Sequence, residues 1–487
     1  MRPMDKEKGA KYMSKKGALL LGGLLFFCQA FFSQPALAEH QPAALAQRGI
    51  VEGFYGQPWS QKQRLDMLDF MGRQGLNLYV YAPKDDPYHR EKWREAYPPA
   101  KLQQLQQLID RAKARQIEFV FAVSPGLDVH LTGEAREEDL QALLAKLSVL
   151  YGKGVRQFAI FFDDIKNKDG QGQAAFLNAV DQRFIKQKPD VKPLFTVPTE
   201  YFSEDMWEPK GTIKPYSKNF AGALAKDIVV LYTGSGVVCE GVTEQNILAV
   251  EKLYRRPVAV WWNYPVNDYR QGKLALGPVH GVAAAAAKHM AAFLMNPMEK
   301  PELSKIALAT GAEFAQAPFA YEEEKAWEKA LGQQYGKLAP AMQVLAEHSQ
   351  RMENTWAHTG RADAPLVRQH MDAFWQDVNK GQPASQAARL LTKDFAAMAK
   401  AAQELKRLPP NVWTEGHKQI TLLGQLAQAD QTALQLIQVK QAGQKARTIL
   451  YRQQLLAQKA ALPKEAVAVL SEKVALSFIY EALRYAK

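Results

Sequence analysis

The chain has 487 residues, of which 47% are hydrophobic and 10% aromatic, so it is long enough for two or three packed domains and too apolar for an intrinsically disordered protein. Its two cysteines, Cys28 and Cys239, exclude a disulfide framework, and Cys239 is expected to be a buried structural residue. The formal net charge is +12, but lysine and arginine are spread without a dense cluster. That distribution favours a solvated basic surface over nucleic-acid binding.

Residues 1–38 have the pattern of a secretory signal peptide. Two lysines (15–16) precede a short apolar stretch (17–32), and Ala36-Leu37-Ala38 forms a small-x-small cleavage site. We expect the mature chain to begin at Glu39 and to be exported, either to the periplasm or out of the cell. The rest of the sequence contains no stretch apolar enough to be a stable membrane span.

From residue 49 to about 285, apolar strand-like runs alternate with helical patterns, among them 60–75, 90–115, 172–187 and 243–254. Eight runs are predicted to be strands: 49–56, 77–83, 119–126, 158–164, 193–201, 228–234, 257–263 and 274–281. Eight β/α units in about 240 residues match the size of a (β/α)8 barrel. A doubly wound parallel sheet is the alternative, but no GxGxxG follows the first strand.

The fourth run, FAIFFDD (158–164), ends in two adjacent carboxylates, Asp163 and Asp164. Each acid disfavours ionisation of the other, so the pKa of one of them is expected to rise. A neutral acid beside an anion is suited to breaking a glycosidic bond near neutral pH. Taken alone, the pair favours a plainer interpretation, in which one Asp caps the next helix and the other is solvated.

Other polar or special residues also stand where predicted strands end. Examples are Gly53, Lys84, Asp163, Asp164, Tyr201, Thr233 and Asn263. In a barrel, the carboxyl ends of all strands meet at one rim, where catalytic sites are assembled. The sequence therefore predicts that these residues converge on one pocket.

After about residue 300 the strand patterns vanish, and Ala, Gln, Leu and Lys dominate between sparse prolines and glycines. We therefore predict an α/β chain with three parts: the signal peptide (1–38), a (β/α)8 barrel (46–300) and an all-α bundle domain (301–487). Four tryptophans of the last part could contact sugars, although their helical spacing favours a core position: Trp327, Trp356, Trp375 and Trp413.

Eight short motifs occur along the chain in this order: VEGFYGQPW (51–59), YAPKDDPYHR (81–90), SPG (124–126), FFDDI (161–165), PTEY (198–201), YTG (232–234), WWN…ND (261–268) and NP (296–297). Together they closely resemble glycoside hydrolase family 84, the family of O-GlcNAcases and bacterial β-N-acetylglucosaminidases once called hyaluronidases. The resemblance covers about residues 46–300. It implies a retaining exo-β-N-acetylglucosaminidase that uses substrate-assisted catalysis through an oxazoline and needs no metal or cofactor.

The resemblance also implies roles for the catalytic residues. Asp163 would orient the substrate's acetamido N–H and stabilise positive charge as the oxazolinium forms. Asp164 would protonate the leaving oxygen and then deprotonate the incoming water. Tyr201 would hold the acetamido oxygen for attack, and an intramolecular nucleophile has a large entropic advantage.

Six further positions match sugar-binding positions of the family: Gly53, Lys84, Trp261, Asn263, Asp268 and Asn296. Asp268 and Asn296 would bind sugar hydroxyls, and Trp261 would form a pocket wall. The chain has Trp262 where the human-type motif has an acid, which leaves the hydrogen bonding behind Asn263 open.

Two other functions remain alternatives at this stage. A non-catalytic GlcNAc-binding protein on the same barrel would not need the proton donor that Asp164 offers. A metal-dependent hydrolase could use the two acids with His89, but the sequence has no HxH or HExxH spacing. The implied partner is a carbohydrate or glycoprotein with terminal β-linked GlcNAc. The C-terminal helices could pair two chains as a homodimer or extend the substrate groove.

Overall fold

The structure, a computed structural model, describes residues 44–463 and 470–487. The predicted signal peptide (1–38), and with it the predicted export, lies outside the described residues and stays a prediction. Within the two described ranges, no helix is both long and apolar enough to cross a membrane.

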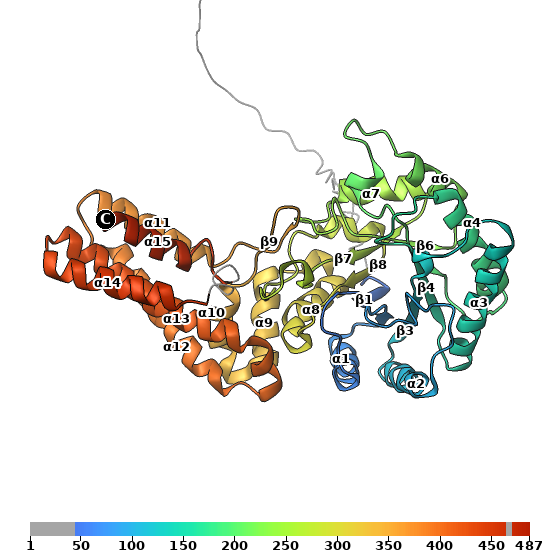
Figure 1. Ribbon diagram of the computed structural model, residues 1–487, viewed down its shortest axis with the longest axis horizontal. Coiled ribbons are helices and arrows are strands. Elements are labelled where there is room, and N and C mark those ends of the chain that lie inside the picture. The colour runs from blue at the N-terminus through green and yellow to red at the C-terminus, as the bar shows by residue number, and fades with distance from the viewer. Residues whose placement is uncertain (1–43, 464–469) are drawn as a thin grey trace, which may run out of the picture. The chain divides into compact units, whose positions relative to one another are not determined.

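Eight parallel strands close into a barrel, which confirms the predicted fold class (Figure 1). Each strand pairs with the next, and β8 pairs with β1. The strands are β1 Gln47–Glu52, β2 Leu78–Tyr81, β3 Glu118–Val123, β4 Gln157–Phe161, β5 Phe195–Val197, β6 Val229–Tyr232, β7 Val258–Trp262 and β8 Met290–Met295. Alternate side chains fill the barrel interior, among them Val51, Val80, Ala122, Ala159, Leu231 and Leu294.

Helices follow the strands and surround the barrel in Figure 1. They are α1 Gln61–Gln74, α2 Pro99–Ala114, α3 Gly133–Gly152, α4 Gly170–Val180, α5 Ser203–Met206, α6 Pro215–Ala223, α7 Glu244–Tyr254 and α8 Pro301–Gln316. Local sequence sets their ends: α1 starts at a capping box between Ser60 and Gln63 and stops at Gly75, whose φ is 71°. The helix predicted over 90–115 begins only at Pro99, because proline fits the first helical turn.

The prediction of the eighth strand was wrong. Residues 274–281 are mostly buried but form no strand, and β8 lies instead at Met290–Met295. The N–H groups of the 274–281 segment find partners outside the sheet: Leu276 donates to the Ser349 carbonyl at 2.8 Å, and Val279 donates to the Thr310 hydroxyl at 2.9 Å. A buried apolar segment whose backbone N–H groups bond to later parts of the chain has the same sequence pattern as a buried strand. The pattern alone therefore could not separate the two.

The chain after the barrel is helical, as predicted. Its elements are α9 Glu323–Tyr335, α10 Ala339–Glu347, the short antiparallel pair β9 Met352–Glu353 and β10 His358–Thr359, α11 Pro365–Asn379, α12 Gln386–Glu404, α13 Pro410–Gln441, α14 Lys445–Ala461 and α15 Ala475–Tyr485. Helix α8 contacts β1, β8 and α1 of the barrel domain and also α9 and α13 of the helical region. Packing is thus continuous across residue 300, and the domain boundary placed there stays a prediction.

Cys239 is buried, as expected for a structural cysteine. Its thiol contacts the carbonyl oxygens of Thr233 at 3.6 Å and Gly241 at 3.3 Å. A Cβ on Gly234 would lie 2.4 Å from the sulfur, and this residue has a φ of +121°. Both packing and backbone conformation therefore require glycine in the YTG motif.

Asp430 on α13 is an acid in the interior of the helical bundle. Its side chain is fully buried, and neither carboxylate oxygen has a hydrogen-bond partner in the part of the chain that the structure describes. Burial raises the pKa of Asp430 well above its ordinary value. The folded state therefore binds this proton more tightly than the unfolded state. The resulting stability is fully present below about pH 4 and is lost as the pH rises toward the folded-state pKa.

The substitution Asp430→Asn removes this titration while keeping the side-chain shape. We expect the Tm of the wild type to fall relative to that of Asp430→Asn as the pH rises from about 4 to about 8. Each unit of pKa difference corresponds to about 1.4 kcal/mol of unfolding free energy. Calorimetry of both proteins across this range provides the test, and parallel Tm curves would contradict the assignment.

Candidate active site

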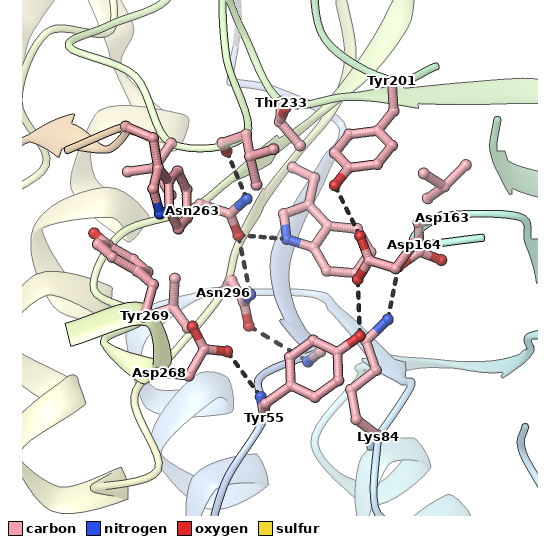
Figure 2. Close-up of a pocket in the computed structure, with 17 residues that line it drawn as sticks. Tyr55, Lys84, Asp163, Asp164, Tyr201, Thr233, Asn263, Asp268, Tyr269 and Asn296 are labelled. Carbon is pink, nitrogen blue, oxygen red and sulfur yellow. Dashed lines mark hydrogen bonds and ion pairs between the residues drawn. The ribbon is translucent and has the colours of Figure 1, made fainter. Parts of the chain in front are cut away.

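A pocket of about 560 Å³ opens at the carboxyl ends of the barrel strands (Figure 2). Its lining residues are Gly53, Tyr55, Lys84, Asp163, Asp164, Val197, Tyr201, Thr233, Val237, Val238, Trp261, Asn263, Val266, Asp268, Tyr269, Asn296 and Trp356. The structure thus brings together all nine residues to which the resemblance gives a catalytic or sugar-binding role, and Thr233 as well. Asp163 and Asp164 follow β4, Lys84 follows β2 and Tyr201 follows β5, so the strand ends deliver them to one rim.

Asp163 forms a buried ion pair with Lys84. The Asp163 Oδ2 and Lys84 Nζ atoms are 2.6 Å apart, and the two side chains are only 9% and 4% exposed. Burial by itself would raise the pKa of Asp163, but the Lys84 ammonium outweighs it and holds that pKa below its usual range. Asp163 is therefore an anion, and the rise in pKa that was expected for one member of the acid pair does not occur at Asp163. Its Oδ1 is buried and has no hydrogen-bond partner among the described residues.

Asp164 has a strained backbone and two tyrosine partners. Its φ is +55°, a left-handed conformation that Asp and Asn tolerate better than most residues. The Tyr201 hydroxyl donates to Oδ1 at 3.1 Å, and the Tyr55 hydroxyl donates to Oδ2 at 2.8 Å (Figure 2). The backbone conformation and these two bonds fix the direction of the carboxyl group.

Both tyrosines are held in their protonated form. Burial raises the pKa of Tyr201 far above its ordinary value, and the nearby Asp164 carboxylate adds to the shift. Burial also raises the pKa of Tyr55, whose hydroxyl accepts a hydrogen bond from Arg90 at 3.0 Å. The two phenols can therefore act only as neutral hydrogen-bond donors or acceptors near neutral pH.

The other wall of the pocket is a network of amides and one acid (Figure 2). Asn263 Oδ1 accepts from Trp261 Nε1 at 2.9 Å and from Asn296 Nδ2 at 3.0 Å, and Asn263 Nδ2 donates to the Val237 carbonyl at 2.8 Å. These bonds fix the amide without an acid at position 262, where Trp262 is buried. The hydrogen bonding of Asn263, which the sequence left open, is therefore supplied by Trp261, Asn296 and the Val237 carbonyl.

Two further details shape this wall. Asp268 Oδ2 accepts the Tyr55 backbone N–H at 2.8 Å, and burial raises the pKa of this carboxyl. A Cβ on Gly53 would lie 2.4 Å from the Trp261 ring, so only glycine allows the strand β1 backbone to approach this close.

The sequence prediction missed two aromatic residues of the pocket, Tyr55 and Tyr269, and favoured a core position for a third, Trp356. Tyr55 stands inside the EGFYG motif, so the motif was a sufficient signal for it. Trp356 lies between β9 and β10, is 54% exposed and packs against Tyr269 with ring centroids 5.3 Å apart. The expectation of a core position was therefore wrong for Trp356, although it holds for the buried Trp327.

His89, which the metal-dependent alternative would use as a ligand with the two acids, does not lie in the pocket. His89 is buried and absent from the pocket lining; its Nδ1 lies 2.7 Å from the Ala122 carbonyl and its Nε2 lies 3.1 Å from the Ser124 hydroxyl. Burial lowers the pKa of His89 to about 4. Within residues 44–463 and 470–487, no group of three or more His, Cys, Asp or Glu side chains is placed to hold a metal ion.

Comparisons with known proteins agree with this geometry. The family model described as beta-N-acetylglucosaminidase matches residues 48–347, and a second model, described as hyaluronidase post-catalytic domain-like, matches residues 366–479. The chain is 34% identical over 269 residues to Protein O-GlcNAcase of Rattus norvegicus and of Mus musculus. This alignment covers 54% of the chain but only 29% of each relative.

Two solved structures have the same fold over most of the chain. CpGH84B is 36% identical with a TM-score of 0.87, and the match covers 90% of this chain and 77% of that one. A mutant of the Thermobaculum terrenum O-GlcNAc hydrolase is 27% identical with a TM-score of 0.80, covering 90% of this chain and 94% of the other. Since the first family model spans well over half of the sequence and its motif residues meet in one pocket, the chain belongs to the beta-N-acetylglucosaminidase family, glycoside hydrolase family 84.

Proposed function

We propose that this protein is a retaining exo-β-N-acetylglucosaminidase that removes terminal β-linked GlcNAc, with the substrate's 2-acetamido oxygen as the nucleophile. One observation carries the proposal: Asp163 is a buried anion whose Oδ2 is neutralised by Lys84, while its Oδ1 has no partner among the described residues. A buried acceptor without a donor is costly. An acetamido N–H bound in this pocket would supply that donor.

In the proposed first step, the acetamido oxygen forms a bond to C1 while the bond from C1 to the leaving oxygen breaks. Asp163 accepts the acetamido N–H, and its charge stabilises the oxazolinium that develops. Tyr201, a neutral donor, holds the acetamido oxygen in the attacking position. Asp164 in its acid form gives its proton to the leaving oxygen.

In the second step, Asp164 takes a proton from water as the water oxygen attacks C1 and the bond to the acetamido oxygen breaks. The acetamido group is restored, and GlcNAc leaves with its β configuration because C1 has been inverted twice. Asp268, Asn296 and Asn263 would hold the sugar hydroxyls during both steps.

The placement of the acids supports substrate assistance over an enzyme nucleophile. A conventional retaining glycosidase places its two carboxyl groups on opposite sides of the scissile bond. Asp163 and Asp164 are consecutive residues and lie on the same side of the pocket, beside Lys84 and Tyr201 (Figure 2). Both carboxyl groups would contact a bound sugar from the same side. No carboxylate of the pair then stands on the opposite face of C1, where the acetamido oxygen of the substrate can attack.

Turnover of a substrate panel separates this proposal from a GlcNAc-binding protein. We expect hydrolysis of aryl β-GlcNAc, chitooligosaccharides or O-GlcNAc peptides and no measurable hydrolysis of aryl β-glucoside, which lacks the acetamido group. Proton NMR of the reaction should show that β-GlcNAc is the first product, which would demonstrate retention of configuration. Binding of GlcNAc without turnover of any member, or equal turnover of the glucoside, would contradict the proposed function.

A further inference from the structure

The loop that carries Asp268 is held in place by the chain that follows the barrel. This β7–β8 connection (residues 263–289) contributes Asn263 and Asp268 to the pocket. Its backbone and side chains bond to later residues at several points. The Tyr264 hydroxyl donates to the Gln350 carbonyl at 3.1 Å, and Gln419 Nε2 donates to the Gly272 carbonyl at 2.5 Å.

A buried ion pair between Lys273 and Asp363 is another of these links. The Lys273 Nζ and Asp363 Oδ2 atoms are 2.6 Å apart, and the two side chains are 5% and 9% exposed. Asp363 Oδ1 also accepts the backbone N–H groups of Gln350 at 2.7 Å and Arg351 at 2.9 Å. One carboxylate therefore joins the barrel loop to the segment that leads into β9.

Lys273 is connected to Asp268 through a short, closed turn. Asn267 Nδ2 donates to the Lys273 carbonyl at 2.7 Å, and the Arg270 N–H donates to the Asn267 carbonyl at 3.0 Å. The Arg270 guanidinium also pairs with Glu472 at 2.6 Å. The position of Lys273 thus sets the position of Asn267, and Asp268 is the next residue.

A buried ion pair of this kind contributes little net stability compared with apolar residues of the same size, because both charges must be desolvated. The best-supported role of such an ion pair is to favour one conformation of the chain over its alternatives. Neither Lys273 nor Asp363 lines the catalytic pocket, so neither can touch the bound sugar there.

We propose that Lys273 and Asp363 are positioning residues for Asp268, and that through them the chain after the barrel sets the sugar-binding geometry of the pocket. The inference rests on the proposed function, in which Asp268 binds sugar hydroxyls. Removing the ion pair releases the 267–273 turn, and a sugar contact displaced by even ~1 Å loses much of its effect.

The test is a double-mutant cycle on an activated aryl β-GlcNAc substrate. We expect Lys273→Met to lower kcat/KM on the order of 10-fold, mainly through KM, and Lys273→Arg to restore most of it. In an Asp268→Asn background, Lys273→Met should cost much less than in the wild type. If Lys273→Met does not fold, Asp363→Asn takes its place in the cycle. Its amide oxygen can still accept the backbone N–H groups of Gln350 and Arg351.

Lys305→Met is the matched control. Lys305 is also a buried lysine, paired with Asp66 at 2.5 Å and Glu302 at 2.8 Å, but neither partner belongs to the 267–273 turn. It should change Tm without coupling to Asp268. Equal losses from Lys273→Met in both backgrounds, or none in either, would overturn the inference and leave the proposed function intact. Unchanged kcat/KM in Asp268→Asn itself would instead remove the sugar contact that the proposed function assigns.

Discussion

Asp164→Asn is expected to lower kcat/KM by ~10²- to 10⁴-fold for substrates with poor leaving groups and much less for activated aryl glycosides. The reason is that a poor leaving oxygen needs a proton as the C1–O bond breaks, and an amide cannot give one. Asparagine is the suitable replacement because the φ of Asp164 is +55°, a conformation that Asn also tolerates. One of the two tyrosine hydroxyls can still donate to the amide oxygen, and the other can accept a hydrogen bond from the amide nitrogen.

The measurement is the dependence of kcat/KM on leaving-group pKa across a series of aryl β-GlcNAc substrates. The dependence should be steeper in Asp164→Asn than in the wild type. Asp85→Asn serves as the control, since Asp85 directly follows the pocket residue Lys84 in the 81–90 motif but does not line the pocket. Parallel plots for Asp164→Asn and the wild type would show that Asp164 is not the proton donor.

Asp163→Asn is expected to lower kcat by ~10²- to 10³-fold even for activated substrates. An asparagine oxygen can still accept the acetamido N–H, so this variant isolates the loss of negative charge beside the developing oxazolinium. It also leaves the buried Lys84 ammonium without its counter-ion, which adds an unfavourable positive charge to the site.

Comparison with Asp163→Ala separates the two contributions, because alanine removes both the charge and the acceptor. We expect Asp163→Ala to be impaired at least as strongly and to raise KM further. Since Lys84 holds the pKa of Asp163 below its ordinary value, Asp163 in the wild type stays ionised to a lower pH than an ordinary aspartate does. A kcat that is insensitive to both substitutions would remove Asp163 from the reaction.

Most of the active site could be predicted because each of its parts is local in sequence. Asp163, Asp164, Lys84 and Tyr201 stand directly after apolar strands, and barrel topology alone brings strand ends to one rim. Asn296 follows β8 in the same way, and its NP motif located it even though the strand itself was misplaced.

The remaining features depend on contacts between distant parts of the chain. Trp356 reaches the pocket from a turn between β9 and β10, more than 50 residues after the barrel strands end, and no local pattern encodes that placement. The ion pair between Lys273 and Asp363 spans 90 positions. The lowered pKa of Asp163 likewise requires Lys84 from another strand end. The acid pair in the sequence predicted a raised pKa for one of the two acids and gave no sign of this cation.

The nucleophilic role of the acetamido group is tested most directly by fluorinating it. Each fluorine on the acetyl methyl withdraws electron density from the carbonyl oxygen and weakens it as a nucleophile, without changing the leaving group. We expect kcat/KM of the wild type to fall steeply and progressively across mono-, di- and trifluoroacetamido aryl glycosides. A flat series, or a glycosyl ester trapped on Asp163, would contradict substrate assistance and make an enzyme carboxylate the nucleophile.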